Sequence, residues 1–195
     1  FNTFINMLST EAFNDGEYNR DRLDDIQNIA PTLFRDGADP ILTIPDVIKV
    51  TNLGWDAYYK PAIGLKLLRE VVVGRDRFDY AFKQYAKRWA YKHPTPYDFF
   101  RSMEDGSGED LGWFWKGWFY ENYKLDQSVK EVQYVEQNPT KGAIITIENL
   151  DQWAMPAVVE LEEAGGKKTR VQLPVEVWQR SGTWTFQSTT KTPLK

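Results

Sequence analysis

The spacing of apolar residues changes once along the chain, from the period of a helix to the period of a strand. Up to about residue 126, apolar side chains recur three or four positions apart, which places them on one face of a helix. From Val129 onward they alternate with polar residues in short runs, as strands do. The change predicts an α+β, multidomain chain with a helical domain over residues 1–126 and an antiparallel β domain over residues 127–195.

The central element of the first part is predicted to be a helix that follows Tyr58, Tyr59 and Lys60 and runs to Gly74. Pro61 is favoured at a first helical position, because its missing N–H has no partner there and its φ is already helical. Two apolar stripes follow: Ile63, Leu67 and Val71, and Leu65, Leu68 and Val72. A helix that is apolar on two faces is buried. We therefore expect a buried helix that begins at a Tyr-Tyr-Lys step.

Further helices are predicted from the same kind of pattern. They cover residues 1–13, 20–29, 75–92, 95–105 and 110–120. The clearest start is at Thr95, which can act as the N-cap before Pro96, with an acid, Asp98, at the third helical position. Elsewhere between residues 17 and 56, prolines and glycines break the pattern, and this stretch is either a covering loop or the wall of a substrate cleft.

Short strands are predicted in the second part. They cover residues 132–135, 143–148, 157–162, 169–173, 175–178 and 183–186. Residues 164–167 form a hairpin turn, and Ser181-Gly182 is expected to join the last two strands in a second hairpin. Strands at this spacing favour an antiparallel sandwich. Thr192 to Lys195 can be the first residues of one more strand, so the sequence can contain only part of the β-sandwich.

Composition removes several classes of function. The 195 residues carry a net charge of −4 and have a sequence pI of about 5.2, which does not fit a nucleic-acid-binding surface. There is no cysteine and one histidine, His93, so disulfides and thiolate metal sites are excluded, and a lone histidine is expected to be a turn residue. No apolar run approaches the ~18 residues that span a bilayer. The sequence starts with neither an initiator Met nor a signal peptide, and we expect it to be part of a longer protein.

Few residues are candidates for chemistry. Glu104-Asp105 and Glu109-Asp110 are paired carboxylates, but each pair lies at a helix end or start, where capping explains it. Tyr58 has two interpretations: a packing residue with a satisfied hydroxyl, or a phenol that donates a hydrogen bond to a developing oxyanion. For Tyr59 we prefer packing. The sequence contains no His-Glu-x-x-His motif, which would supply two zinc ligands and a general base.

Three tryptophans gather in the predicted helix 110–120. There are two hypotheses for Trp113, Trp115 and Trp118. Their side chains either fill a core or form an exposed platform on which a peptide or a carbohydrate stacks. In the second case the chain is a non-catalytic binding module, with the β-sandwich serving in adhesion. The burial of these three side chains distinguishes the two hypotheses.

A run of motifs resembles one family of enzymes. The segment Tyr58-Tyr59-Lys60-Pro61-Ala62 looks like the Tyr-x-Lys-Gly-Ala element of the zinc aminopeptidases of the aminopeptidase N and leukotriene hydrolase kind, which are gluzincin metallopeptidases. The downstream segments Thr95 to Phe100, Ser107 to Leu111 and Trp113 to Phe119 follow in the order that this family has. Pro61 departs from the pattern, because the family usually has glycine there.

The resemblance implies both a fold and a function. Residues 1–126 would be the helical C-terminal lobe of a thermolysin-like catalytic domain, and residues 127–195 an immunoglobulin-like β-sandwich. The parent protein would remove N-terminal residues from peptides with a zinc-activated water, and Tyr58 would stabilise the oxyanion. The zinc ligands would lie in the missing N-terminal part of the catalytic domain, so this chain alone is expected to bind no cofactor and to be inactive. A periplasmic, secreted or membrane-associated parent is compatible with the family.

Overall fold

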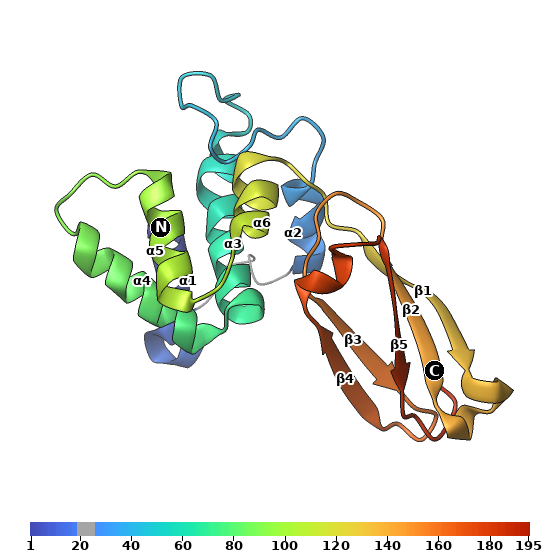
Figure 1. Cartoon of the computed structure of the whole chain (residues 1–195). Helices are drawn as coiled ribbons and strands as arrows, with labels where there is room; N and C mark the ends of the chain where they lie inside the picture. Colours follow the sequence, from blue (N-terminus) through green and yellow to red (C-terminus); the bar gives the residue numbers. More distant parts are fainter. Residues whose placement is uncertain (19–25) are drawn as a thin grey trace. The chain divides into compact units, whose positions relative to one another are not determined.

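The computed structural model describes residues 1–18 and 26–195, and these divide into two compact units (Figure 1). One unit is Phe1–Asn122 and the other is Tyr123–Lys195. The division falls four residues before the predicted change of period, because the extended segment after Asn122 belongs to the second unit. Within that unit, Trp153 N donates to Lys124 O at 3.1 Å and Leu150 N donates to Asp126 O at 2.7 Å.

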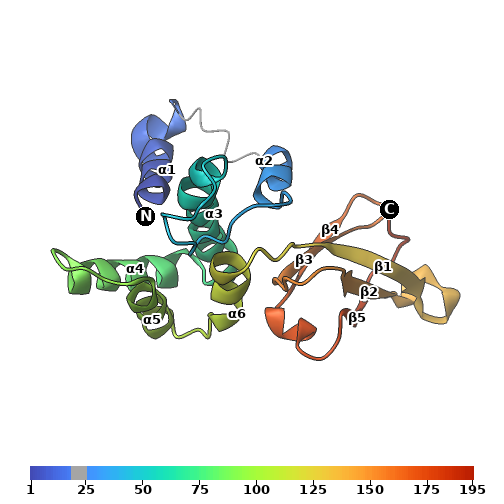
Figure 2. The same ribbon diagram turned by 90° about the horizontal axis from the view of Figure 1, so that it is seen from above.

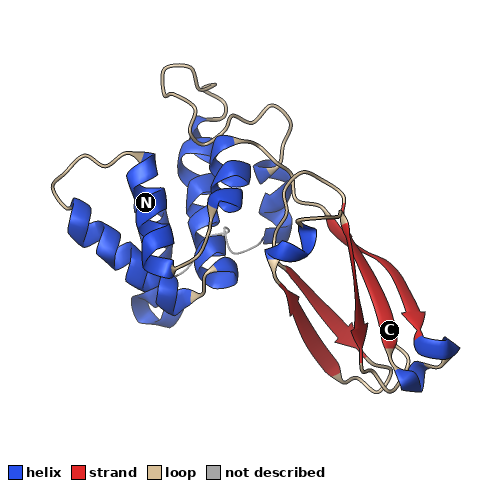
Figure 3. Cartoon of the chain, in the orientation of Figure 1, coloured by secondary structure: helices blue, strands red, loops and turns tan. Residues whose placement is uncertain are grey.

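The first unit is helical and the second contains antiparallel sheets, which confirms the predicted α+β class (Figure 3). The helical elements of the first unit are α1 (Asn2–Ala12), η1 (Phe13–Gly16), α2 (Ile26–Leu33), η3 (Trp55–Tyr59), α3 (Lys60–Leu67), η4 (Leu68–Val72), α4 (Arg75–Trp89), α5 (Pro96–Ser107), α6 (Gly112–Trp115) and η5 (Lys116–Tyr120). All five further helical segments are therefore present, although residues 20–25 of the second lie outside the described residues. In the part of the chain that the structure describes, no helix is long and apolar enough to cross a membrane.

The central helix is buried as predicted, but it begins earlier than predicted. Ile63, Leu65 and Leu68 are each at most 2% exposed. The helix starts at residue 53 and passes through η3, so Pro61 lies inside it and not at its first position. A proline inside a helix removes one hydrogen bond and crowds the preceding turn. That preceding turn is a wide π turn, in which Lys60 N donates to Trp55 O, and it accommodates the proline.

Helices α4 and α5 run side by side (Figures 1 and 2). Their contact is close because Gly106 on α5 faces Ala81 on α4, and a Cβ at position 106 would lie 2.6 Å from the Cβ of Ala81. The start of α5 is the predicted one: Thr95 and Asp98 form a capping box, with each side chain bonded to the backbone of the other residue. Gly108 ends the helix in the left-handed conformation, with φ of 69°.

The second unit contains two antiparallel sheets. Its strands are β1 (Gln127–Tyr134), β2 (Ala143–Asn149), β3 (Ala157–Glu162), β4 (Lys168–Leu173) and β5 (Thr183–Ser188). One sheet has the order β1-β2-β5, and β3 pairs with β4 in the other. Inward-facing residues of β2, β3 and β4 form one core with Val177 and Trp178, so the two sheets stabilise one another.

One predicted strand is wrong. Residues 175–178 form a 3₁₀ turn, η8 (Val175–Trp178), and β5 pairs with β2 and not with this segment. The reason is that Val177 and Trp178 are consecutive and both buried, whereas neighbours in a strand point to opposite faces. The indole Nε1 of Trp178 donates to Met155 O at 2.9 Å, which anchors the turn.

Candidate functional site

Tyr58 lies in the π turn η3, immediately before the buried helix α3, and its side chain is 57% exposed. Its hydroxyl has no hydrogen-bond partner among the residues that the structure describes. Tyr59 differs, because it is less exposed and its ring packs against Trp55 with centroids 5.1 Å apart. Among the described residues neither hydroxyl has a hydrogen-bond partner, so the two phenols differ in exposure and in the packing of the Tyr59 ring within its own helix.

A buried carboxylate, that of Asp56, stabilises the turn that carries Tyr58. Asp56 is fully buried, and its two oxygens each lie 3.1 Å from Nη2 of Arg35. The same carboxylate accepts the backbone N–H of Asp39 at 2.9 Å, and Arg35 also donates to Asn52 Oδ1 at 3.0 Å. These bonds join residues 35–39 to the start of the helix, so the stretch predicted as a cover or a cleft wall is fixed at this point.

Lys60 is the second buried charge at the site, with 2% exposure. Its Nζ donates to Asn122 Oδ1 at 2.6 Å and lies 5.7 Å from the centre of the Trp118 ring. Asn122 in turn donates to Ala38 O at 2.6 Å. The pKa of Lys60 is lowered to about 8, mainly by burial; the charge of Asp56 opposes this shift and the charge of Arg35 adds to it.

Trp118 completes the support of this helix. Its ring is 1% exposed, and its Nε1 donates to Lys60 O at 3.0 Å. Trp115 is also buried, its Nε1 donates to Glu104 Oε1 at 3.0 Å, and its ring stacks on Phe100. Trp115 and Trp118 therefore belong to the core, whereas Trp113 is only half-buried, and an exposed platform of all three tryptophans is not supported.

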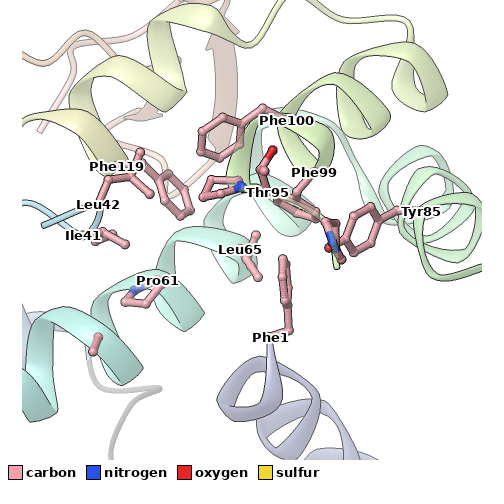
Figure 4. A pocket seen from close by; sticks show the side chains of 13 residues that line it. Phe1, Ile41, Leu42, Pro61, Leu65, Tyr85, Thr95, Phe99, Phe100 and Phe119 are labelled. Carbon is pink, nitrogen blue, oxygen red and sulfur yellow. The ribbon is translucent and has the colours of Figure 1, made fainter. Parts of the chain in front are cut away.

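An apolar cavity of about 370 Å³ lies against the same helix (Figure 4). Ala57, Pro61 and Leu65, which recur every fourth residue, form one side of it. The facing side is aromatic and contains Phe99, Phe100 and Phe119, while Ile41 and Leu42 come from the long connection before the helix. The cavity thus lies on the helix face formed by Ala57, Pro61 and Leu65, and Tyr58 is not among its lining residues; it has the size and the lining of a pocket for an apolar side chain.

Three of the four remaining candidate carboxylates have structural roles. Glu104 accepts the backbone N–H of Leu111 at 3.2 Å besides the indole of Trp115, and Asp110 accepts the N–H of Gly112 at 3.1 Å. Glu109 forms an ion pair with Arg77. These carboxylates therefore cap and brace helix ends, as expected from their positions.

A bound metal ion needs several ligand side chains that converge on one point. Within residues 1–18 and 26–195, no three His, Cys, Asp or Glu side chains come together as a ligand set. His93 is exposed after the end of α4. The residues of this chain that the structure describes therefore do not fit a zinc ion by themselves, and no catalytic step through a metal is derived from them.

Sequence patterns did not indicate the buried polar groups around Tyr58. A lysine and an aspartate are usually exposed, and Asp56 and Lys60 stand among aromatic residues in a segment with no clear helical pattern of its own. The only available signal was their four-residue spacing, which places them on one side of a helix.

Comparisons with known proteins give a fold but no family. No protein-family model and no curated protein matches the chain. The structure is similar to the crystal structure of Legionella pneumophila aminopeptidase A in complex with aspartic acid, with a TM-score of 0.53 and 19% sequence identity. The similarity covers 72% of this chain and 16% of that chain, so this chain spans a small part of the length of the protein it matches. The likeness shows that this chain shares its fold with a part of that protein.

Proposed function

We propose that this chain is part of a zinc-dependent aminopeptidase of the aminopeptidase N and leukotriene hydrolase kind. In this proposal the helical unit is the C-terminal lobe of a thermolysin-like catalytic domain, and the unit of antiparallel sheets is an immunoglobulin-like β-sandwich. The motif resemblance around Tyr58 supports the proposal, and so does the peptidase-like fold, since the protein that it matches is an aminopeptidase. The zinc ligands are assigned to the part of the parent that this sequence does not include.

The observation that carries the proposal is the state of Tyr58. It is an exposed phenol with no described hydrogen-bond partner, in a turn braced by Asp56, Lys60 and Trp118. A phenol carries an O–H group, which can donate a hydrogen bond to an oxyanion. A donor held by a rigid scaffold stabilises the negative charge of a tetrahedral intermediate with little reorganisation. Tyr58 is therefore the residue to which we assign that hydrogen bond.

The adjoining apolar cavity is the place that we assign to a side chain of the peptide substrate. Apolar and aromatic residues line it on both sides, and none of the described lining residues has a charged side chain. A charged substrate side chain would lose its hydration there without gaining an ion pair. We accordingly propose that the parent prefers peptides with a large apolar residue at the cleavage site.

The test is a pair of substitutions in the full-length parent protein. Tyr58→Phe should lower kcat by about 10²–10³-fold, the cost of losing one oxyanion donor, with a smaller effect on KM because the bond forms mainly in the transition state. Tyr59→Phe is the matched control and should be close to silent. Metal content and melting temperature should be unchanged in both variants.

Two outcomes would contradict the assignment. If Tyr59→Phe slows turnover and Tyr58→Phe does not, the donor is the neighbouring tyrosine. If neither variant slows peptide hydrolysis, the helix start has no part in catalysis. The pocket has its own test, a Leu65→Trp variant, which narrows the cavity. If this variant keeps the preference between apolar and charged substrates unchanged, the assignment of the cavity as a side-chain pocket is wrong, and the assignment of Tyr58 is unaffected.

A further inference from the structure

Strand β3 has one paired edge and one edge that is largely free. In the antiparallel pairing with β4, Ala157 lies opposite Leu173 and Leu161 lies opposite Thr169. Glu163 N continues this ladder by donating to Lys167 O at 2.9 Å. Because successive residues of a strand point their backbone groups to opposite sides, the N–H and C=O groups of Val158 and Glu160 point away from β4. Among the described residues, β3 has no second neighbouring strand along this stretch.

The last residues of the sequence already begin to pair with this edge. Lys195 N donates to Glu162 O at 2.9 Å, and Ala164 N donates to Pro193 O at 2.7 Å. These two bonds enclose an antiparallel bridge between Glu163 and Leu194. The side chains agree with this register, since Nζ of Lys195 lies 2.7 Å from Glu162 Oε1 directly opposite.

The segment before Lys195 is firmly anchored, so its direction is fixed. The buried carboxylate of Glu163 accepts the hydroxyl of Thr192 at 2.8 Å and the N–H of Lys191 at 3.2 Å. Leu194 N donates to the hydroxyl of Tyr134 at 2.9 Å, and the side chain of Leu194 packs against the core. Continued in the same direction, the backbone would run antiparallel along the free edge of β3.

A groove lies beside the part of the edge that such a strand would reach. It has a volume of about 290 Å³ and lies between β3 and the start of β1. Its apolar lining includes Val129, Ile147, Ala157 and Val159. Val129, at the edge of the groove, is 54% exposed, whereas Ile147 and Ala157 at its base are buried.

We propose that the free edge of β3 is a strand-acceptor site, and that its occupant is the polypeptide that follows Lys195 in the parent protein. Antiparallel register sets the chemistry of this occupant. Its first, third and fifth residues would lie opposite Leu161, Val159 and Ala157 and face the core, so they should be apolar. Its second and fourth residues would lie opposite Glu160 and Val158, exchange backbone hydrogen bonds with them and face solvent. The occupant rests on the proposed function, in which this chain belongs to a longer protein.

The test adds six residues to the full 195-residue chain. The first variant carries Val-Thr-Val-Lys-Val-Thr, with apolar residues at the inward positions, and the second carries Thr-Val-Lys-Val-Thr-Val, which has the same composition in the opposite alternation. The third places proline at the second and fourth added positions, where it removes the N–H donors. The fourth carries the six residues that follow Lys195 in the parent gene. Hydrogen exchange at the amides of Val158 and Glu160 is measured in each, with the amide of Leu161, which faces β4, as an internal reference.

We expect the first and fourth variants to slow exchange at both amides by at least about tenfold, and the second and third to leave it as in the unextended chain. The proposal would be overturned if the amides of Val158 and Glu160 in the unextended chain already exchange as slowly as that of Leu161. It would also be overturned if the first and second variants slow exchange at these amides equally. Protection by the first variant but not by the fourth would overturn the assigned occupant. None of these measurements depends on peptidase activity. If the Tyr58 test fails, slowed exchange at the amides of Val158 and Glu160 would therefore still support the strand-acceptor site.

Discussion

The indole of Trp118 lies directly on Gly64. A Cβ at position 64 would be 2.0 Å from Nε1 of this ring and 2.4 Å from its Cδ1. The glycine is therefore what allows the indole to reach Lys60 O across the helix, and through this contact η5 braces the turn that carries Tyr58.

Gly64→Ala should destabilise the helical unit, although alanine is the better helix former. The added methyl group cannot be accommodated without moving the ring, and overpacking of this kind costs about 1–3 kcal/mol. Gly54→Ala is the control: Gly54 has helical dihedrals, and nothing lies within 4 Å of a Cβ built there. This control should be neutral or stabilise by up to about 1 kcal/mol. Denaturant unfolding followed by helical circular dichroism measures both, and equal effects would contradict the close contact.

Trp118→Ala should cost roughly 3–5 kcal/mol in the free energy of unfolding, as large-to-small changes in a core do. The side chain is 1% exposed, whereas Trp184 on β5 is 42% exposed. Trp184→Ala is the matched control and should cost less than about 1 kcal/mol. A loss below about 1 kcal/mol for Trp118→Ala as well would revive the hypothesis of an exposed stacking surface.

The stability of the helical unit should rise between about pH 8 and the unfolded pKa of lysine. Burial lowers the pKa of Lys60 to about 8 from 10.5, so the unfolded state binds more protons in this interval. Stability increases with pH wherever the unfolded state binds more protons. The charged form of Lys60 therefore costs free energy below pH 8, and the cost is relieved as the amine loses its proton in the folded state.

A Lys60→Met variant separates the contribution of Lys60 to the pH dependence of stability from the contributions of the tyrosines and the N-terminus, which also titrate at alkaline pH. The free energy of unfolding of the wild type minus that of the variant should increase across the interval by at most about 3 kcal/mol. Urea melts at several pH values between 7 and 10.5 give this difference. A difference that stays flat would show that Lys60 is hydrated and not buried as described.

The 195-residue chain should bind no stoichiometric zinc. It has no cysteine and a single histidine, and the described residues bring together no three acidic or histidine side chains. Calorimetric titration of zinc at neutral pH measures this, with a chelator-treated sample as the reference. One tight site would reveal ligands built from carboxylates, and the zinc ligands would then no longer need to lie elsewhere in the parent.

Local signals predicted most of the helices and the β3–β4 hairpin. Thr95 and Asp98 cap α5 as their spacing indicated, and Gly165-Gly166 turns the chain between adjacent strands. Pairings between distant segments were not predictable in this way. Residues 175–178 have the alternation of a strand, but the burial of Trp178 over Met155 decides their conformation, and this partner is distant in sequence. Likewise, the motif around Tyr58 indicated the candidate residue, while the burial of Lys60 depends on Asn122 and Trp118 from the other end of the unit.

The position of β2 in the middle of its sheet has a consequence for the order of events during synthesis. Helices α4 and α5 can pair as soon as they leave the ribosome, because their contacts are local in sequence. Strand β2 pairs with β1 soon after it is made, but its other edge waits for β5, in which Ser188 lies opposite Ala143. Until Trp178 and β5 emerge, the nascent chain exposes the apolar row Ala143, Ile145 and Ile147 beside an unpaired strand edge. During this interval the growing polypeptide carries an apolar row beside an unpaired strand edge, a combination that favours aggregation.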